Sequence, residues 1–165
     1  MRGIRGSKEA MGFVILTILL SLVFVVSIAF ATLKYEYGSA DGVYWNVVVG
    51  DLSYNPVTKT TSSYHYYYVY NGREEKIYYT AEFDSWIGGQ PGFQARESHT
   101  WVELEPGTPA SYGNTLVIDV NGLTPGWKYW LNAYTRIKLY DKDGDPISIS
   151  PPKDGQIEDQ LEFTR

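Results

Sequence analysis

Hydrophobic and polar positions follow two different rules along this chain, and the change falls near residue 34. Residues 11–33 contain no Asp, Glu, Lys or Arg, and hydrophobic side chains would occupy every side of a helix built from them. These 23 residues would rise about 35 Å as a helix, slightly more than the roughly 30 Å hydrocarbon core of a bilayer. The pattern therefore predicts a long hydrophobic α-helix that lies in a membrane at some stage of the protein's life.

After residue 34 the alternation typical of strands takes over. Runs of β-branched and aromatic residues are separated by Gly, Pro, Asn and Asp, which favour turns. In the most regular run, alternate tyrosines from Tyr64 to Tyr70 fall on one face of a strand and the residues between them on the other. Many short strands with no helix between them favour an antiparallel β-sandwich. The expected strands are residues 43–49, 64–70, 76–83, 100–104, 115–120, 128–140, 146–150 and 160–164.

Two dipeptides predict hairpin turns within this β region. Asn71-Gly72 and Asp143-Gly144 both supply residues that accept the positive φ angles of tight turns. The first predicts a hairpin between the strands at 64–70 and 76–83. The second predicts a hairpin between the end of the 128–140 strand and residues 147–149.

One short motif narrows the type of sandwich. Residues 123–129, Leu-Thr-Pro-Gly-Trp-Lys-Tyr, resemble the turn into strand F of fibronectin type III and immunoglobulin-like domains. The resemblance implies that Leu123 plugs the core, Pro125 and Gly126 turn the chain, and Tyr129 forms a structural tyrosine corner. The expected fold class is therefore mainly β: a long hydrophobic N-terminal α-helix followed by an antiparallel immunoglobulin-like β-sandwich.

Charge divides the chain at the same place as the hydrophobic pattern. Arg2, Arg5 and Lys8 face only Glu9 in the first ten residues, whereas residues 34–165 hold 11 basic and 18 acidic residues, a net charge of −7. Basic residues before an apolar span predict a cytoplasmic start and an external C-terminal domain. Three fates are open to the span: a secretory signal cut after Ala29-Phe30-Ala31, a permanent single-span anchor, or a cut on its cytoplasmic side.

The residues around the basic start resemble the N-terminus of archaeal type IV pilins. In that family a short basic leader ends in a small residue, and a Ser/Glu-containing patch and an apolar helix follow, as in residues 2–30 here. The resemblance implies cleavage by a prepilin peptidase between Gly6 and Ser7. Glu9 would then be the third mature residue, whereas bacterial pilins carry their Glu fifth; a cut after Gly3 is the alternative and would place it sixth.

An apolar helix that has left the membrane must bury every face, and packing against copies of itself generates a filament when the contacts do not close. Lys8 and Glu9 are the candidates for setting the axial register between copies, because a carboxylate buried there needs a partner. The candidate residues of the filament core are Phe13, Ile15, Leu16, Leu19, Leu20, Val23, Phe24 and Val26.

Composition excludes several classes of function. The formal net charge is −5 and no two basic residues are adjacent, so the chain has no means of neutralising several phosphates of a nucleic acid. The chain has no Cys and two His, which rules out disulfides, thiolate catalysis and a three-histidine zinc centre. No catalytic residue, cofactor site or metal site is predicted.

Two segments are candidate sites. Residues 141–145 alternate carboxylates as calcium loops do, but the twelfth position is Pro152, and a polar hairpin tip is the favoured interpretation. Residues 84–94 form the longest expected irregular stretch. Exposure of its Trp86 and Phe93 side chains to water would be energetically unfavourable. This loop either covers the core, contacts a neighbouring subunit, or offers an adhesive surface on which a glycan can stack.

The predicted organisation is a leader over residues 1–6, a hydrophobic helix over 7–34 and a β-sandwich head over 35–165. The predicted function is a non-enzymatic structural subunit, a pilin, of an extracellular archaeal type IV pilus-like filament that serves adhesion. Its expected partners are copies of itself, the cytoplasmic membrane during export, the prepilin peptidase and assembly machinery, and surface glycans. The alternative is a membrane-anchored extracellular β-sandwich that binds glycans as an adhesin or accessory ectodomain.

Overall fold

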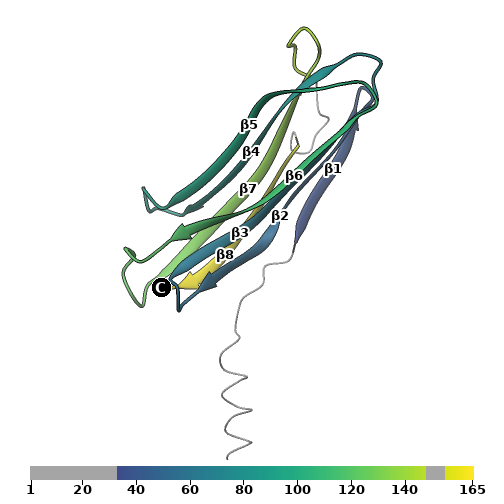
Figure 1. Cartoon of the computed structure of the whole chain (residues 1–165). Coiled ribbons are helices and arrows are strands. Elements are labelled where there is room, and N and C mark those ends of the chain that lie inside the picture. Colours follow the sequence, from purple (N-terminus) through teal and green to yellow (C-terminus); the bar gives the residue numbers. More distant parts are fainter. Residues whose placement is uncertain (1–32, 148–154) are drawn as a thin grey trace, which may run out of the picture.

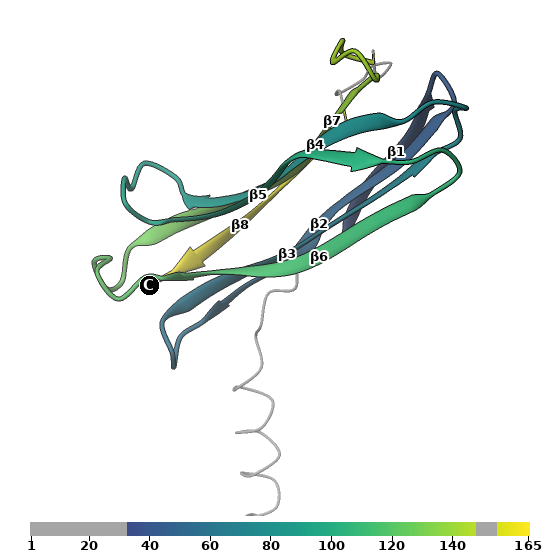
Figure 2. The ribbon, with the colours of Figure 1, turned by 45° about the horizontal axis from the view of Figure 1, so that its top comes forward.

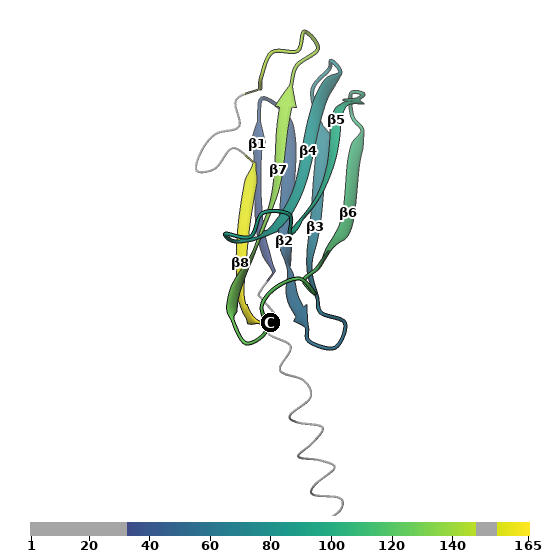
Figure 3. The same ribbon diagram turned by 90° about the vertical axis from the view of Figure 1, so that its left-hand side faces the viewer.

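A computed structural model describes residues 33–147 and 155–165, and these residues form an antiparallel β-sandwich (Figure 1). Two sheets of four strands pack face to face, with the strand orders β1-β2-β3-β6 and β5-β4-β7-β8. Figure 2 shows the two layers, and Figure 3 shows the strands running along the long axis of the molecule. The strands are β1 (Lys34–Ala40), β2 (Val43–Asn55), β3 (Thr60–Asn71), β4 (Ile77–Ile87), β5 (Gln94–Leu104), β6 (Pro109–Asp119), β7 (Lys128–Tyr140) and β8 (Gln156–Thr164).

The expected fold class is corrected to all-β. Within the described residues every regular element is a strand. The predicted leader and nearly all of the predicted helix over 7–34 fall outside the described residues. Lys34, expected to end that helix, instead begins β1, because the alternating sequence Lys-Tyr-Glu-Tyr pairs with β2. Across residues 33–147 and 155–165, no helix has the length and hydrophobicity needed to cross a bilayer.

The alternating pattern decides which side chains are buried. In β3 the even-numbered tyrosines from Tyr64 to Tyr70 are half-buried on the outer face, while His65, Tyr67 and Val69 are buried between the sheets. Inward-facing residues form two adjoining hydrophobic clusters. The first contains Val43, Trp45, Val47, Tyr67, Val69, Ile77, Tyr79, Phe83, Ile137 and Leu139, and the second contains Val49, Leu52, Ile87, Ile118, Val120, Leu123, Leu131 and Phe163.

Strand β1 was not predicted, and it packs closely on the first cluster. It lies on the edge of its sheet, antiparallel to β2. A Cβ atom at Gly38 would lie 2.7 Å from the Trp45 side chain, so only glycine allows this approach. Lys34 also forms an ion pair of 2.7 Å with Asp159 of β8, which ties β1 to the opposite sheet.

The predicted hairpin at Asn71-Gly72 is wrong, because the chain crosses from one sheet to the other there. Strand β3 pairs with β2 and β6, whereas β4 pairs with β5 and β7. The buried Asn71 side chain holds the crossing: its Nδ2 donates to the carbonyl oxygens of Glu75 (2.9 Å) and Leu104 (3.0 Å). Its Oδ1 accepts from the backbone N–H of Arg73. The hydrogen bonds of the buried Asn71 amide thus stabilise a crossing between the sheets at the place where the dipeptide predicted a hairpin turn.

Several predicted strands are longer in the structure than in the sequence analysis, notably β2, β4 and β5. Of the predicted strand at 146–150, only Pro146 and Ile147 lie within the described residues. They form an isolated bridge from Pro146 to Tyr140 and a backbone hydrogen bond from Ile147 to Leu139. The turn at Asp143-Gly144 therefore returns the chain to β7, but the returning segment does not form a named strand there.

The loop before β7 has the geometry of a tyrosine corner. The Thr124 backbone N–H donates to the Tyr129 hydroxyl at 3.1 Å, and both Tyr129 and Leu123 are buried in the second cluster. Gly126 adopts a positive φ of 78°, which completes the turn after Pro125.

Removing that hydroxyl tests the corner. Tyr129→Phe is expected to lower the free energy of unfolding by about 1 kcal/mol, because the Thr124 N–H loses its partner. Tyr44→Phe is the matched control: this ring is 54% exposed, and its loss of a hydroxyl should change stability by less than about 0.5 kcal/mol. Urea denaturation of both variants measures the difference; equal values would show that the corner does not stabilise the fold.

Candidate functional site

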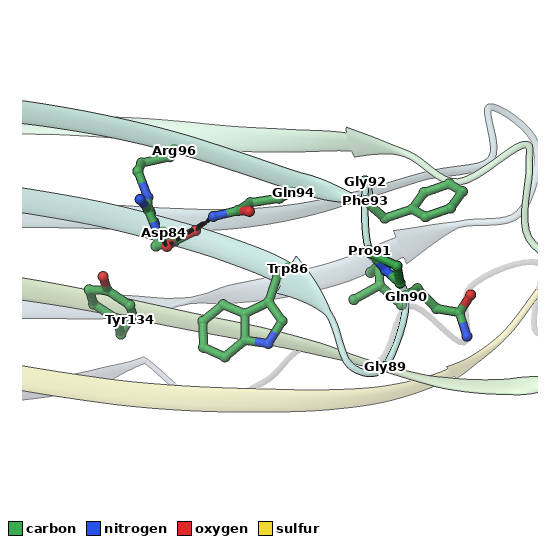
Figure 4. Close-up of a pocket in the computed structure, with 11 residues that line it drawn as sticks. Asp84, Trp86, Gly89, Gln90, Pro91, Gly92, Phe93, Gln94, Arg96 and Tyr134 are labelled. Atoms are coloured by element: carbon green, nitrogen blue, oxygen red, sulfur yellow. Dashed lines mark hydrogen bonds and ion pairs between the residues drawn. The ribbon is translucent and has the colours of Figure 1, made fainter.

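An open groove of about 530 Å³ lies beside the connection between β4 and β5 (Figure 4). Its walls come from the ends of these two strands, from the loop that joins them, and from Tyr134 of the neighbouring β7. The lining residues are Asp84, Trp86, Ile87, Gly89, Gln90, Pro91, Gly92, Phe93, Gln94, Arg96 and Tyr134.

The loop is shorter and more ordered than the sequence suggested. The expected irregular stretch at 84–94 contains only six residues outside strands, because β4 continues to Ile87 and β5 begins at Gln94. The Ile87 N–H donates to the Phe93 carbonyl at 2.9 Å, and the Gly88 N–H donates to the Trp130 carbonyl at the same distance. Gly89 and Gly92 have φ angles of 69° and 92°, which favour glycine.

The two aromatic residues predicted for this loop have different roles. Phe93 is partly buried and packs against the second hydrophobic cluster, so it anchors the loop to the sandwich. A Cβ atom at Gly122 would lie 3.1 Å from the Phe93 ring, which shows how closely the β6–β7 loop approaches it. Trp86 projects instead from the outer face of β4 into the groove, as Figure 4 shows. The structure therefore brings both residues to the groove: Phe93 lines it and also anchors the loop, whereas Trp86 projects into it.

Trp86 and Tyr134 form an aromatic pair across β4 and β7. Their ring centroids lie 6.0 Å apart at an interplanar angle of 68°. Arg136 lies over the Tyr134 ring, 5.5 Å from its centroid, and Glu82 accepts a hydrogen bond from the Tyr134 hydroxyl. Burial, and secondarily the charge of Glu82, raises the pKa of Tyr134, so the hydroxyl stays protonated.

A charged cluster forms the polar side of the groove. The side chain of Asp84 is 4% exposed and accepts hydrogen bonds from Gln94 Nε2 (3.0 and 3.2 Å) and from Arg96 Nε (2.9 Å). Arg96 Nη2 forms a second close contact with the same carboxylate, and this interaction raises the pKa of the Arg96 guanidinium. Because Arg96 is itself exposed, it retains donor groups that face solvent beside the aromatic pair.

A second hollow of about 370 Å³ lies on the other side of Trp86. It is bordered by polar residues of β1, β7 and β8, among them Lys34, Asn132, Glu158 and Gln160. Gln160 Nε2 donates to Asn132 Oδ1 at 2.9 Å, and Lys34 Nζ donates to the Glu158 carbonyl at 3.3 Å. Trp86 thus borders both the groove and this second, more polar hollow.

The groups that line this groove can bind a ligand through stacking and hydrogen bonds. An aromatic ring beside amide, guanidinium and carboxylate groups provides stacking and hydrogen bonding for a polyhydroxylated ligand. The two nearest carboxylates, Asp84 and Glu82, are each engaged by an arginine, Arg96 and Arg136 respectively. Within residues 33–147 and 155–165 no group of three or more His, Asp or Glu side chains is placed to hold a metal ion.

The histidine with the most hydrogen bonds lies in the core and not in the groove. His65 is fully buried: Nε2 contacts the hydroxyls of Ser63 (2.9 Å) and Ser85 (3.0 Å), and Nδ1 contacts Thr135 Oγ1 (3.0 Å). Its ring stacks on Phe83. Burial lowers the pKa of His65 to about 4, so it is neutral at pH 7. Because no surface reaches these serines, the cluster joins the two sheets as a structural network.

The second histidine and the carboxylate-rich turn are also structural. His99 Nδ1 lies 2.9 Å from the Tyr67 hydroxyl, and Glu97 accepts a hydrogen bond from Asn114 of β6, which closes the side of the sandwich between β5 and β6. In the turn at 141–145, Asp141 Oδ1 accepts the backbone N–H groups of Asp143 and Asp145, each at 2.9 Å. This carboxylate thus organises the hairpin tip.

The remaining predicted site residues lie outside the described part of the chain. These are the processing residues Gly6 and Ser7, the register residues Lys8 and Glu9, and the core positions between Phe13 and Val26. In the groove, sequence analysis identified Trp86 and Phe93 but not Tyr134 or Arg96. Alternation places Tyr134 and Arg96 on outer faces, but only the strand pairing of β4 with β5 and β7 brings them beside Asp84.

No protein-family model matches the chain, and no curated protein matches it. Among solved structures, a putative ApaA protein from Bordetella pertussis is 11% identical at a TM-score of 0.38, covering 79% of this chain and 89% of that one. A protein from Archaeoglobus fulgidus is 12% identical at a TM-score of 0.35 (83% and 98% covered). A FixG-related protein from Vibrio parahaemolyticus is 16% identical at a TM-score of 0.34 (76% and 97% covered). At such low scores and identities these likenesses carry no argument about function.

Proposed function

We propose that this chain is an exported structural subunit of an extracellular, archaeal type IV pilus-like filament. The observation that carries the proposal is the order of its parts: a short basic start containing Gly6, an uncharged segment at 11–33, and an acidic β-sandwich. An uncharged segment of this length must be sheltered by lipid or by protein. Copies that shelter one another's segments through head-to-tail contacts that do not close would form a filament.

The way in which the sandwich meets this segment supports the proposal. Strand β1 begins at Lys34, the residue that directly follows the uncharged segment at 11–33. Seven residues of β1 pair with β2, and the ion pair between Lys34 and Asp159 adds a contact with β8. The first residues of the head after the uncharged segment are thus anchored to both sheets. The proposal assigns the chain no reaction, cofactor or metal.

Electron microscopy of material sheared from the surface of the source cells tests this proposal. We expect filaments in which the chain is the major component, and their loss when the gene is deleted. The protein would then localise to extracellular filaments, with its precursor in the cytoplasmic membrane. Recovery of the chain only as separate molecules in the membrane fraction would contradict the filament.

The groove favours a second candidate function, a membrane-anchored ectodomain that binds surface glycans. Its specific support is the Trp86–Tyr134 pair, since a sugar ring can stack on an aromatic face while the polar groups that flank Trp86 bind its hydroxyls. If this function is correct, Trp86→Ala should abolish retention of the protein on immobilised surface glycans. Trp127→Ala is the control, because Trp127 is 66% exposed on another loop. Equal retention of the two variants would contradict the glycan site.

A further inference from the structure

The outer face of the sheet β1-β2-β3-β6 is covered by tyrosines and carries no charge over four successive rows of paired residues. One row runs from Ser39 through Tyr44 and Tyr70 to Pro109, and the next from Tyr37 through Asn46 and Tyr68 to Ser111. The third runs from Tyr35 through Val48 and Tyr66 to Gly113, and the fourth from Gly50 through Tyr64 to Thr115. We call these four rows the tyrosine face; none of their residues is Asp, Glu, Lys or Arg.

The rings of this face are available to a partner. Tyr35, Tyr37 and Tyr44 are 62%, 72% and 54% exposed, and the alternate tyrosines of β3 are half-buried beside them. Tyr35 stacks on Tyr37 with centroids 6.1 Å apart. Tyrosine accompanied by Ser, Gly and Asn is the composition of antibody binding sites, in which each Tyr ring adds a large contact area at a low entropic cost. The tyrosine face therefore has the chemistry of an interface.

The opposite face of the sandwich is charged. Its central rows contain Arg96, Asp84 and Glu158, and then Glu82 and Arg136. Residues 34–165 as a whole carry a net charge of −7. Copies that approach through most of their surface would therefore bring negative charges together, whereas two tyrosine faces meet without this repulsion. Charge thus favours a second copy of this chain as the partner of the tyrosine face.

The position of the face points to the same partner. One of its two edge strands is β1, which begins at Lys34 directly after Leu33 and carries Tyr35 and Tyr37. If the uncharged segments of neighbouring copies lie together, as the proposed function requires, the β1 edges of their sandwiches are brought close to one another. The tyrosine faces would then be the nearest uncharged surfaces of the two heads.

We propose that the tyrosine face is the contact surface between the heads of neighbouring copies of this chain. The inference rests on the proposed function, in which the uncharged segments at 11–33 hold neighbouring copies together. Four strands about 4.8 Å apart and seven residues of about 3.4 Å each give a face on the order of 400 Å². Since stable interfaces bury about 800 Å² per partner, the face supports association only when the copies are already held close, which raises their effective concentration.

Because the chain has no native Cys, single cysteines can report this contact without interference. Ser111 is exposed on β6 in the tyrosine face, and Ser98 is exposed on β5 in the charged face. The full-length chain in native membranes or filaments, carrying either Ser111→Cys or Ser98→Cys, is treated with a short bis-maleimide. We expect crosslinked dimers from Ser111→Cys and monomers from Ser98→Cys. Comparable crosslinking of both positions, or none at Ser111, would overturn the inference.

A charge placed on either face provides the matched second measurement. Thr115→Glu adds a carboxylate to the tyrosine face, and Thr100→Glu adds one to an exposed position of β5. In the Ser111→Cys background, Thr115→Glu should reduce crosslinking at least about tenfold because like charges then meet, and Thr100→Glu should not. An unchanged yield with Thr115→Glu overturns the inference.

The result is independent of whether filaments form. Filaments without crosslinks at Ser111 would contradict the tyrosine face as the contact and leave the proposed function intact. Specific crosslinks in the absence of filaments would support the contact and contradict the filament. If the tyrosine face instead lies on lipid or on a glycan, Ser111→Cys will be protected from a monofunctional maleimide without forming dimers, and the inference fails.

Discussion

Deleting residues 1–32 is expected to abolish assembly completely while leaving the sandwich folded. The uncharged stretch at 11–33 is lost with this deletion apart from Leu33, so neither a lipid bilayer nor neighbouring copies would retain the chain. The two hydrophobic clusters contain residues from β2 onwards, so the core of the sandwich is kept. Leu33 is kept in the truncated chain because it packs closely on Gly50 of β2. A Cβ atom placed on Gly50 would lie only 2.8 Å from the Leu33 Cα.

The measurement compares sedimentation of filaments with the thermal unfolding of the head. We expect all of the truncated chain in the supernatant, with a melting temperature unchanged from that of the head in the full-length chain. A paired substitution refines the test: Leu20→Arg should also prevent assembly, because an unpaired charge would be buried, whereas Leu20→Ile should not. Sedimentation of the truncated chain as filaments would show that the sandwich assembles without the segment.

The second large effect is a loss of stability on mild acidification, caused by His65. Burial lowers its pKa from 6.5 to about 4, so the unfolded chain binds a proton in a pH range in which the folded chain does not. Stability is therefore fully present above pH 6.5 and is lost as the pH falls towards 4. The shift corresponds to about 3 kcal/mol in all, of which about 2 kcal/mol should be lost between pH 7.5 and pH 5.

His65→Leu should remove most of this pH dependence. The hydroxyls left behind keep partners, because Ser63 and Ser85 lie 2.6 Å apart and Thr135 donates to the Val48 carbonyl at 2.7 Å. Urea denaturation of residues 33–165 at pH 7.5 and pH 5 measures the change, with His99→Gln as the control that keeps the dependence of the native chain. The same loss of stability in His65→Leu as in the native chain would contradict the assignment to His65.

Local alternation was sufficient to predict the β-sandwich and the burial of β3, since a period of two assigns each residue to a face without knowledge of its neighbours. Strand β1 was missed for the opposite reason. Its sequence lacks β-branched residues and contains Gly38, and its place in the fold depends on the contact between Gly38 and the Trp45 ring. A contact between two strands is not encoded in the periodicity of either one.

Contacts between distant parts of the chain also explain why the local pattern failed to predict the chain path at Asn71-Gly72 and two residues of the groove. Asn71-Gly72 has a hairpin sequence, but the Asn71 side chain binds the Leu104 carbonyl, 33 residues away, and directs the chain to the other sheet. In the groove, the apolar loop residues identified Trp86, whereas Tyr134 and Arg96 reach it through the register of two further strands. Their positions follow from tertiary pairing and not from any local motif.

The mass of the intact mature protein, isolated from the cell surface, tests the central claim most directly. The claim is that the uncharged segment at 11–33 remains joined to the sandwich after export. It predicts a mature chain that begins at Ser7, or at Ile4 if the cut follows Gly3, and therefore retains the whole segment. A mature chain that begins at Thr32 would lack the segment and would contradict both the filament and the membrane anchor.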